Sequence, residues 1–389
     1  MHFTNFDTNT NGSRISFEIN DIDVSVVNSI RRTVFTDIPS VGFYFDLNNH
    51  FVENDLTIEQ NDSPLHNEFL AHRLSLIPIH FDKDEIDNWS QPEYQFILEK
   101  SNTSNEIVCV TTGDFQILNT KTGKIMPASF IKRLFPANEI TEDHILLTKL
   151  KPNLEDNDKG NHIKVSGYAR KGVGRDCICW GVVSECTFFN TIDKAFAKSV
   201  IDEQIKDKTK EEKKSMIQDF NSLEQYRHYK KNKYGDPNSF QFSLESETGL
   251  SAKFILYKSI VILTNMFEKL LVELREKNDS EVITIVPADV PNMYVITFKN
   301  YTHTVGNLIQ SHMLNNHIRK KPDNDTYDLD YVGYSVPHPL EELFILKVKF
   351  NKVVSVKQLY SFMKENLERI ETELLQLTEE WVSFSQVDV

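Results

Sequence analysis

Cys177, Cys179 and Cys186 are the one set of cysteines that lies close together in the sequence. A structural zinc site usually holds its metal with four sulfur or nitrogen ligands, often supplied as Cys-x2-Cys pairs. Here the first two cysteines are two residues apart and no clear fourth ligand is nearby. Because free cysteine packs as a small hydrophobic side chain, we expect core thiols. A zinc protein built on these three residues stays open as an alternative.

Other residue types with catalytic potential do not form a recognisable set. The Gly-Val-Gly turn at 172–174 completes neither the dinucleotide-binding nor the Walker spacing, so a tight turn is expected there. No His-Glu-x-x-His motif or Ser/His/Asp set surrounds the histidines near predicted helix ends or prolines. These histidines are His66, His72, His303 and His338. The sequence therefore predicts no catalytic residue and no cofactor of the chain's own.

Two pairs of basic residues, Arg31-Arg32 and His72-Arg73, lie on short predicted helices beside apolar stripes. Arginine is a good interface anchor, because its planar head pairs with carboxylates while its stem packs. The alternative is salt bridges within the chain, to Asp37 and to Glu68.

Short elements must position these side chains. One strand is expected within residues 4–23, and Asp23 then caps a helix with an inner face of Val27, Ile30 and Val34. A second helix is expected to start at 62–64 and carries Leu65, Phe69 and Leu70. Residues 282–286 and 293–298 are expected to form a hairpin, and a helix from Thr304 should bury Val305, Leu308, Ile309 and Met313. An alternating strand follows, with Phe344, Leu346, Val348 and Phe350 on one face.

Two long helices are predicted from apolar residues that recur in steps of four and three. The first carries Leu256, Ile260, Leu263, Phe267, Leu270 and Leu274, and residues 277–280 follow it as a linker. The second, capped by Ser355, carries Val356, Tyr360, Met363, Leu367, Ile370, Leu374, Leu377 and Trp381. Exposing either face to water costs about 25 cal/mol per Å² of apolar area. Since each long helix ends a similar series of strands and a short helix, we expect two like units to pack together as an intramolecular heterodimer.

Composition sets the class of protein. A chain of 389 residues with 40% hydrophobic residues has enough apolar material for about two or three folded domains. The chain has few cysteines, a polar start without a signal-peptide pattern, and no apolar run of roughly 18 residues. These features predict a soluble intracellular protein without membrane contact. A net charge of −14 disfavours tight duplex binding by the chain alone. The charged segment 201–238 is expected to be a solvated helical excursion. The alternative is a phosphate-binding arm, as in a stand-alone DNA-binding transcription regulator that uses the basic residues of 206–233.

Several stretches resemble the third-largest subunit of eukaryotic RNA polymerase II, with the archaeal D and bacterial alpha subunits as relatives. They are 27–41 (VNSIRRTVFTDIPSV), 61–79 (NDSPLHNEFLAHRLSLIPI), 162–180 and 242–250 (FSLESETGL). Two later stretches, 303–308 (HTVGNL) and 332–340 (VGYSVPHPL), resemble the archaeal L-like, eleventh subunit. In that family the two subunits form a heterodimer that nucleates polymerase assembly.

The resemblance implies an α+β chain with a discontinuous larger dimerisation unit (1–42 and 162–278), an inserted domain (43–161) and a smaller dimerisation unit (279–389). It implies a non-catalytic scaffold on which the second-largest and largest subunits dock, together with small polymerase subunits, and which meets DNA and RNA only through the complex. The residues expected to face other subunits are Arg31, Arg32, Glu68, His72, Arg73, Pro337 and His338. Those expected in the intramolecular dimer are Leu256, Ile260, Leu263, Phe267, Leu270, Met363, Leu367, Ile370 and Leu374.

Two departures from the family pattern matter. Many relatives carry a four-cysteine zinc loop, but residues 81–98 contain no cysteine, so zinc is not expected. The catalytic magnesium is expected in another subunit. The two subunits are normally separate chains, and joined forms are found in some large DNA viruses of eukaryotes. A viral origin would predict the host cytoplasm or viral factory as the location, and also the virion.

Overall fold

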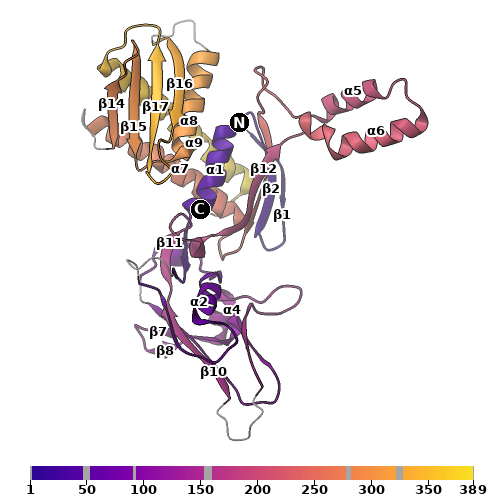
Figure 1. Cartoon of the computed structure of the whole chain (residues 1–389), viewed down its shortest axis with the longest axis vertical. Coiled ribbons are helices and arrows are strands. Elements are labelled where there is room, and N and C mark those ends of the chain that lie inside the picture. Colours follow the sequence, from indigo (N-terminus) through magenta and orange to yellow (C-terminus); the bar gives the residue numbers. More distant parts are fainter. Residues whose placement is uncertain are drawn as a thin grey trace. The chain divides into compact units, whose positions relative to one another are not determined.

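The computed structural model describes residues 2–46, 53–90, 93–152, 160–276, 282–320 and 327–388. It divides into two compact units. The first comprises Met1–Val34, Glu185–Leu244 and Leu256–Val389, and the second Phe35–Ser184 and Glu245–Ile255. Both combine helices with antiparallel strand pairs (Figure 1), which confirms the predicted α+β class. The predicted linker at 277–280 lies outside the described residues.

The first unit contains two four-stranded sheets, in the orders β1-β2-β13-β12 and β14-β15-β17-β16. Their strands are β1 (His2–Thr8), β2 (Arg14–Asn20), β12 (Val183–Asn190), β13 (Ser239–Ser246), β14 (Ile283–Pro287), β15 (Met293–Lys299), β16 (Leu329–Ser335) and β17 (Leu343–Phe350). The helical elements are α1 (Val24–Thr36), α5 (Lys194–Gln204), α6 (Lys210–Ser222), η3 (Glu224–Arg227), α7 (Ala252–Glu276), α8 (His303–Met313), η4 (Leu314–Arg319) and α9 (Val356–Ser385). The first residues of β12 and α7 and the last of α1 and β13 fall in the second unit.

The start of the chain forms a hairpin, β1 paired with β2, where the sequence predicted one strand. The turn is stabilised by Asn9, whose side-chain oxygen accepts a hydrogen bond from the backbone N–H of Arg14 at 2.9 Å and whose amide donates to Ser13 at 2.9 Å. Asparagine favours turns because its side chain bonds to nearby backbone in this way. The prediction of a single strand was wrong because it overlooked this turn.

Helices α1 and α7 cover one face of the first sheet. Val27 and Ile30 of α1, Leu256 and Ile260 of α7, and Phe17 of β2 line the same small apolar cavity. The predicted inner face of α1 is buried, as expected from its spacing.

The second sheet carries α8 against it. The alternating residues predicted to point inward on β17 are all buried, and so are those predicted for α8. Close packing requires Gly306 in α8, since a Cβ there would lie 2.9 Å from the Tyr334 ring and 3.1 Å from the Phe344 ring. The predicted hairpin is confirmed as β14 and β15.

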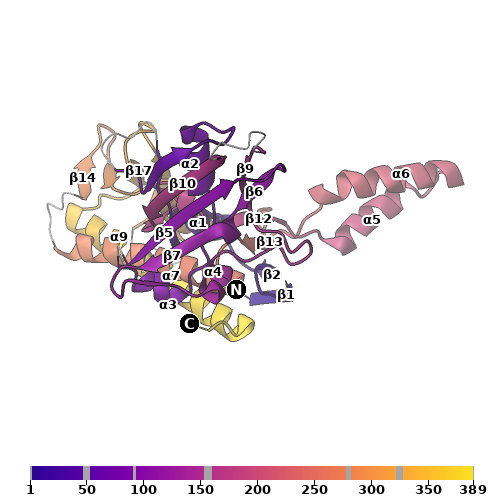
Figure 2. The same cartoon turned by 90° about the horizontal axis from the view of Figure 1, so that it is seen from below.

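The second unit contains a five-stranded sheet in the order β4-β10-β5-β7-β8 and two strand pairs, β3 with β11 and β6 with β9. Figure 2 shows three strands of the sheet, β10, β5 and β7. Its strands are β3 (Pro39–Gly42), β4 (Leu56–Asn61), β5 (Tyr94–Asn102), β6 (Val108–Thr111), β7 (Phe115–Asn119), β8 (Lys124–Ile125), β9 (Leu146–Leu150), β10 (Asn161–Tyr168) and β11 (Arg170–Val173). Its helical elements are α2 (Asn67–Ser75), α3 (Lys83–Asp87), α4 (Ala128–Leu134), η1 (Thr112–Asp114) and η2 (Ile178–Trp180).

Helix α2 begins later than the sequence predicted. The side chain of Asn61 accepts from the N–H of Ser63 at 3.0 Å and donates to the carbonyl of Leu65 at 2.8 Å, so these residues form a turn before the helix. The later start changes which side chains face inward. Leu70 is fully buried, whereas its neighbour Phe69 is 65% exposed.

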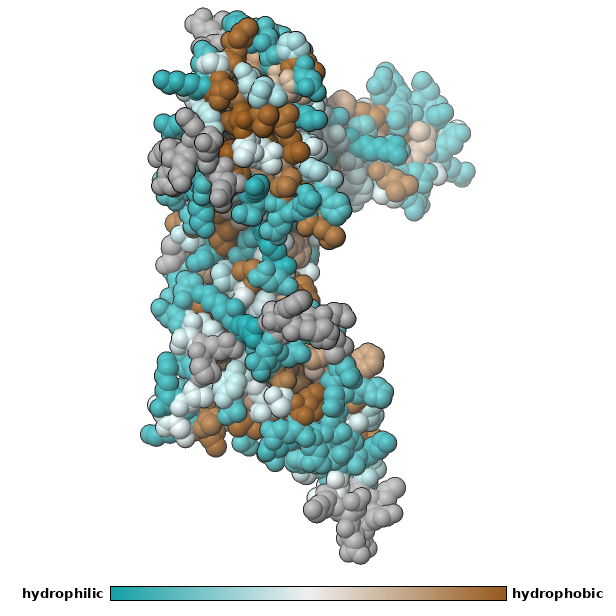
Figure 3. Space-filling view, turned by 60° about the vertical axis from the view of Figure 1, so that its left-hand side comes forward, coloured by the Kyte–Doolittle hydropathy of each residue, from teal (hydrophilic) through white to brown (hydrophobic). Residues whose placement is uncertain are grey.

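The helical part of the excursion predicted at 201–238 is an arm of α5 and α6, which lie side by side (Figures 1 and 2). The arm begins earlier than predicted, at Lys194, and α6 ends at Ser222. Its small core consists of Ala197, Ile201 and Phe220. Figure 3 shows the arm as a mostly hydrophilic projection with a few hydrophobic side chains. Among the described residues, no helix combines the length and apolar character that crossing a bilayer requires.

Candidate intramolecular dimerisation interface

Helix α1 contacts α8, although about 270 residues separate them in the sequence. The Arg32 Nε donates a hydrogen bond to the Thr304 hydroxyl at 2.9 Å, and the Ser29 hydroxyl donates to the Thr304 carbonyl at 3.3 Å. The Nε of Arg32 thus contacts α8 in the same unit, and the expectation that Arg32 faces a large subunit stays a prediction.

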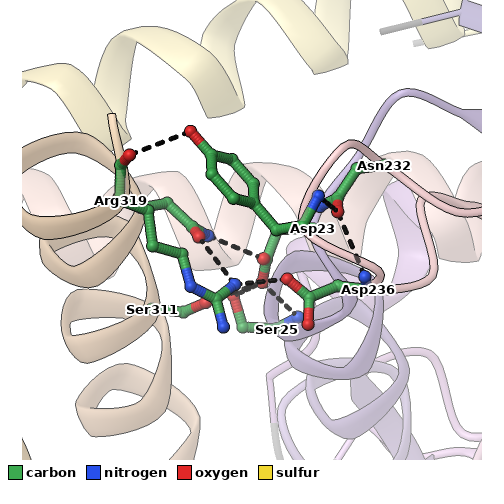
Figure 4. A network of polar contacts seen from close by, with 8 residues as sticks. Asp23, Ser25, Asn232, Asp236, Ser311 and Arg319 are labelled. Carbon is green, nitrogen blue, oxygen red and sulfur yellow. Dashed lines mark hydrogen bonds and ion pairs between the residues drawn. The ribbon is translucent and has the colours of Figure 1, made fainter. Parts of the chain in front are cut away.

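Asp23, which precedes α1, joins the two segments most extensively (Figure 4). One carboxylate oxygen accepts from the Ser25 N–H at 2.8 Å, which confirms the predicted cap. The same oxygen accepts from the Ser311 hydroxyl at 2.9 Å, and the other accepts from the Asn315 amide at 2.9 Å. One side chain therefore caps α1 and bonds to both α8 and η4. The sequence identified the cap but not these distant partners, because spacing carries no information about them.

A third polar contact links residues 232–236 to η4. The Arg319 guanidinium forms an ion pair with Asp236. The Tyr234 hydroxyl donates to the Arg319 carbonyl at 2.9 Å. Figure 4 shows Asp236 and Arg319 next to the Asp23 network.

Aromatic packing joins the end of α9 to the first sheet. The Trp381 ring lies 5.1 Å from that of Phe3 and 4.9 Å from that of Phe17, measured between centroids. Phe3 and Phe6, three residues apart, both contact Phe384. In a regular strand such residues face opposite sides. The register of β1 shifts between Thr4 and Asp7, and this irregularity allows both rings to reach α9.

The predicted faces of both long helices are buried over most of their length. All nine residues expected in the dimer are at most 2% exposed, namely Leu256, Ile260, Leu263, Phe267, Leu270, Met363, Leu367, Ile370 and Leu374. At the start of α9 the prediction was wrong, because Val356 is exposed and Leu359 and Phe362 are buried instead. A straight helix has 3.6 residues per turn, so its buried face drifts about 20° per heptad from a strict seven-residue repeat.

Two polar features of this unit were missed by the sequence analysis. Buried Asn366 of α9 lies 2.9 Å from the Nε2 of His317. A cavity of about 360 Å³ adjoins the Asp23 network and is lined by residues of α1, α8, η4 and α9, among them His312 and Glu373. The His312 Nδ1 lies 3.7 Å from the Glu373 carboxylate.

The residues predicted to face other subunits lie in both units. In the first unit, Arg31 is half-buried and donates to the Asn28 side chain at 3.0 and 3.1 Å, while Pro337 and His338 are exposed. In the second unit, Glu68 and His72 are exposed on α2. Arg73 donates to the carbonyls of Leu146 and Leu147 at 2.7 and 3.0 Å. Asp37 pairs with Arg175 at 2.6 Å.

Cys179 and Cys186 are core side chains of the second and first unit respectively, and Cys177 packs partly buried against the cluster of Cys179. Burial raises the pKa of Cys186 to about 12, and burial also raises the pKa of Cys179. Both are therefore protonated thiols at neutral pH. Among the described residues, no group of three or more His, Cys, Asp or Glu side chains is arranged to hold a metal ion.

Part of this interface matches a known family of dimerisation domains. Residues 294–380 match the family model of the RNA polymerase Rpb3/Rpb11 dimerisation domain. The match spans β15 to α9 and includes Thr304, Ser311 and Asn315, which contact α1 or its cap. The chain therefore contains an Rpb3/Rpb11-type dimerisation domain.

The chain is also homologous to proteins named as RNA polymerase subunit 3. The subunit 3 of RNA polymerases II, IV and V of Arabidopsis thaliana is 28% identical over 199 residues, which are 48% of this chain and 56% of that protein. The RNA polymerase II subunit rpb3 of Dictyostelium discoideum is 28% identical, over 45% of this chain and 53% of that protein. The archaeal subunit Rpo3 of Methanobrevibacter smithii is 25% identical, over 45% and 53%. The chain thus spans about half the length of these curated relatives.

Proposed function

We propose that this chain is a non-catalytic assembly subunit of a DNA-directed RNA polymerase, in which a subunit-3-like part and an eleventh-subunit-like part pair within one chain. The observation that carries this proposal is the contact between the matched dimerisation domain and the start of the chain. Helix α8 bonds to α1 and to its cap Asp23, and α9 packs on β1 and β2.

In this proposal the larger dimerisation unit consists of 1–42 and 162–278, the inserted domain of 43–161 and the smaller dimerisation unit of 279–389. A covalent link of this kind raises the effective concentration of the two parts to the millimolar range when the linker is short and flexible. The heterodimer would then form without a bimolecular step. Its function would be to offer a preformed surface, while nucleotide addition at the catalytic magnesium takes place in another subunit.

The outer face of α2 supports a docking role. Phe69 and Leu76 are exposed there, beside Glu68 and His72. Exposed apolar side chains rimmed by charged residues are typical of protein interfaces. A second candidate surface is the turn with Pro337, His338 and Leu340, of which Leu340 is 88% exposed.

We assign these surfaces to the second-largest and largest polymerase subunits, whose docking the heterodimer would nucleate. Small polymerase subunits would join the same complex. In this assembly role, the chain would contact DNA and RNA only through the complex. The chain would be soluble and intracellular, and a viral origin would place it in the host cytoplasm or viral factory.

Docking is tested by co-expressing the tagged chain with the second-largest subunit of its own source. We expect Phe69→Asp to abolish co-purification, because it buries a charge in an apolar contact. Phe196→Asp is the matched control, since Phe196 is also exposed but lies on the arm. Equal capture by wild type and Phe69→Asp would contradict the assignment of α2.

Pairing within the chain is tested by inserting a protease site between residues 278 and 279. After cleavage, the two fragments should co-elute in gel filtration as one species. Separation of the fragments under native conditions would contradict the intramolecular heterodimer. The isolated chain, given template, nucleotides and magnesium, should synthesise no RNA.

A further inference from the structure

The segment that follows α6 has a composition unlike the rest of the chain. Residues 226–234 read YRHYKKNKY, with four lysines or arginines, three tyrosines and no acidic residue, in a chain of net charge −14. We name this segment the basic–aromatic loop. The arm helices before it mix lysines with glutamates and aspartates.

The structure holds the basic–aromatic loop in one defined conformation. The Asn232 side chain accepts from the N–H groups of Tyr234 and Asp236 at 2.8 and 3.1 Å. The chain reverses at Gly235, whose φ of +89° suits glycine. Arg319 then fixes the turn through its ion pair with Asp236 (Figure 4). A loop ordered before binding loses less conformational entropy when it meets a ligand.

Two lysines of the loop have charges that no carboxylate of the described residues neutralises. Lys231 Nζ lies 4.7 Å from the Tyr229 ring centroid and Lys233 Nζ lies 5.0 Å from that of Tyr234. Neither lysine forms an ion pair within the part of the chain that the structure describes. By contrast, Arg227 pairs with Glu224 at 3.1 Å. The cation–π contacts position both ammonium groups and leave them at the surface.

An unpacked aromatic ring accompanies these charges. Tyr226 in η3 is 57% exposed. Proteins that bind single strands without sequence preference combine lysines or arginines along the phosphate backbone with aromatic rings on which bases stack. Duplex DNA offers no free base face for such stacking, and the acidic remainder of this chain repels its long rows of phosphates.

We propose that the basic–aromatic loop binds single-stranded nucleic acid, with Lys231 and Lys233 on phosphates and Tyr226 stacked on a base. This activity goes beyond the assembly role and does not depend on it. The loop would bind unpaired DNA or RNA weakly and without sequence preference.

The test measures fluorescence anisotropy of about 12-nucleotide labelled oligo(dT) and oligo(U) with the full-length chain, at about 50 mM salt and above. Lys231→Glu/Lys233→Glu should weaken binding about tenfold or more and reduce the salt slope by about 1.4, at about 0.7 per phosphate contact. The matched control is Lys206→Glu/Lys208→Glu, two exposed lysines of the same spacing between α5 and α6. It changes the net charge equally and should weaken binding less than about threefold.

Tyr226→Ala should weaken binding about fivefold or more while leaving the salt slope unchanged, since it removes stacking and no charge. Unchanged urea unfolding of each variant shows that the loss is local. Equal losses in both lysine pairs, no binding by the wild-type chain at about 50 mM salt, or no effect of Tyr226→Ala would overturn the proposal. Equally tight binding of polyglutamate would assign the surface to an acidic protein instead. Comparison of oligo(dT) with oligo(U) distinguishes DNA from RNA.

Discussion

Replacing Asp23 by alanine is the sharpest single test of how the start of α1 pairs with α8 and η4. The Asp23 carboxylate accepts hydrogen bonds from the Ser25 backbone and hydroxyl, the Ser311 hydroxyl and the Asn315 amide. Removing it deletes the cap of α1 and both bonds to the matched dimerisation domain together. We expect the whole first unit to lose stability, because these bonds join its two ends.

The magnitude follows from the cap, to which Ser25 contributes both its N–H and its hydroxyl, and from the two distant hydrogen bonds. A helix cap is worth about 1 kcal/mol. Each hydrogen bond to Ser311 and Asn315 contributes about 0.5–1.5 kcal/mol net of solvation. Asn315 lines the adjoining cavity, which has both polar and apolar walls, so water can reach the amide left behind and its desolvation penalty is reduced. We therefore expect Asp23→Ala to lower the free energy of unfolding by about 2–4 kcal/mol.

The assay is equilibrium urea unfolding of the full chain, followed by circular dichroism. Asp7→Ala is the control, since Asp7 is exposed on β1 and its side chain forms no hydrogen bond or ion pair with any described residue, and it should change stability by less than about 0.5 kcal/mol. In a double-mutant cycle, Asp23→Ala and Asn315→Ala should couple by about 1 kcal/mol. Additivity within about 0.3 kcal/mol would refute the inference that this bond joins the two ends.

Three further predictions concern packing, protonation and thiol reactivity. Phe3→Ala should cost about 3–5 kcal/mol in urea unfolding, because Phe3 is buried against α9, whereas Phe69→Ala, at an exposed ring, should cost less than about 0.5 kcal/mol. Burial lowers the pKa of His80 below 6.5, partly opposed by a nearby glutamate, so stability should be full above pH 6.5 and fall as the pH drops toward the folded pKa. His80→Gln should remove that part of the pH dependence, and an unchanged pH profile would contradict it. Alkylation at neutral pH should label exposed Cys109 quickly and buried Cys186 slowly, as read by peptide mass spectrometry, and similar rates would argue against a buried protonated thiol.

Local sequence patterns predicted the regular elements well where one face packs on a core. The alternation in β17, the spacing in α8 and the cap at Ser355 all appear in the structure. Patterns were less informative at element boundaries. The start of α2 was misplaced because a side-chain-stabilised turn at Asn61 competes with the helix. The start of the α9 face was misplaced because an exact heptad was assumed for a helix of 3.6 residues per turn.

By itself the sequence determined the α+β class, the short helices, and most of the apolar faces of both long helices, because periodicity is a local property of the chain. Only the tertiary structure decided which distant side chains meet. Asp23 was identified as a cap, but its bonds to Ser311 and Asn315 depend on contacts across nearly 300 residues. Phe3 and Phe6 reach the same helix only because β1 is irregular between them. Such pairings depend on how whole elements dock, which no local spacing specifies.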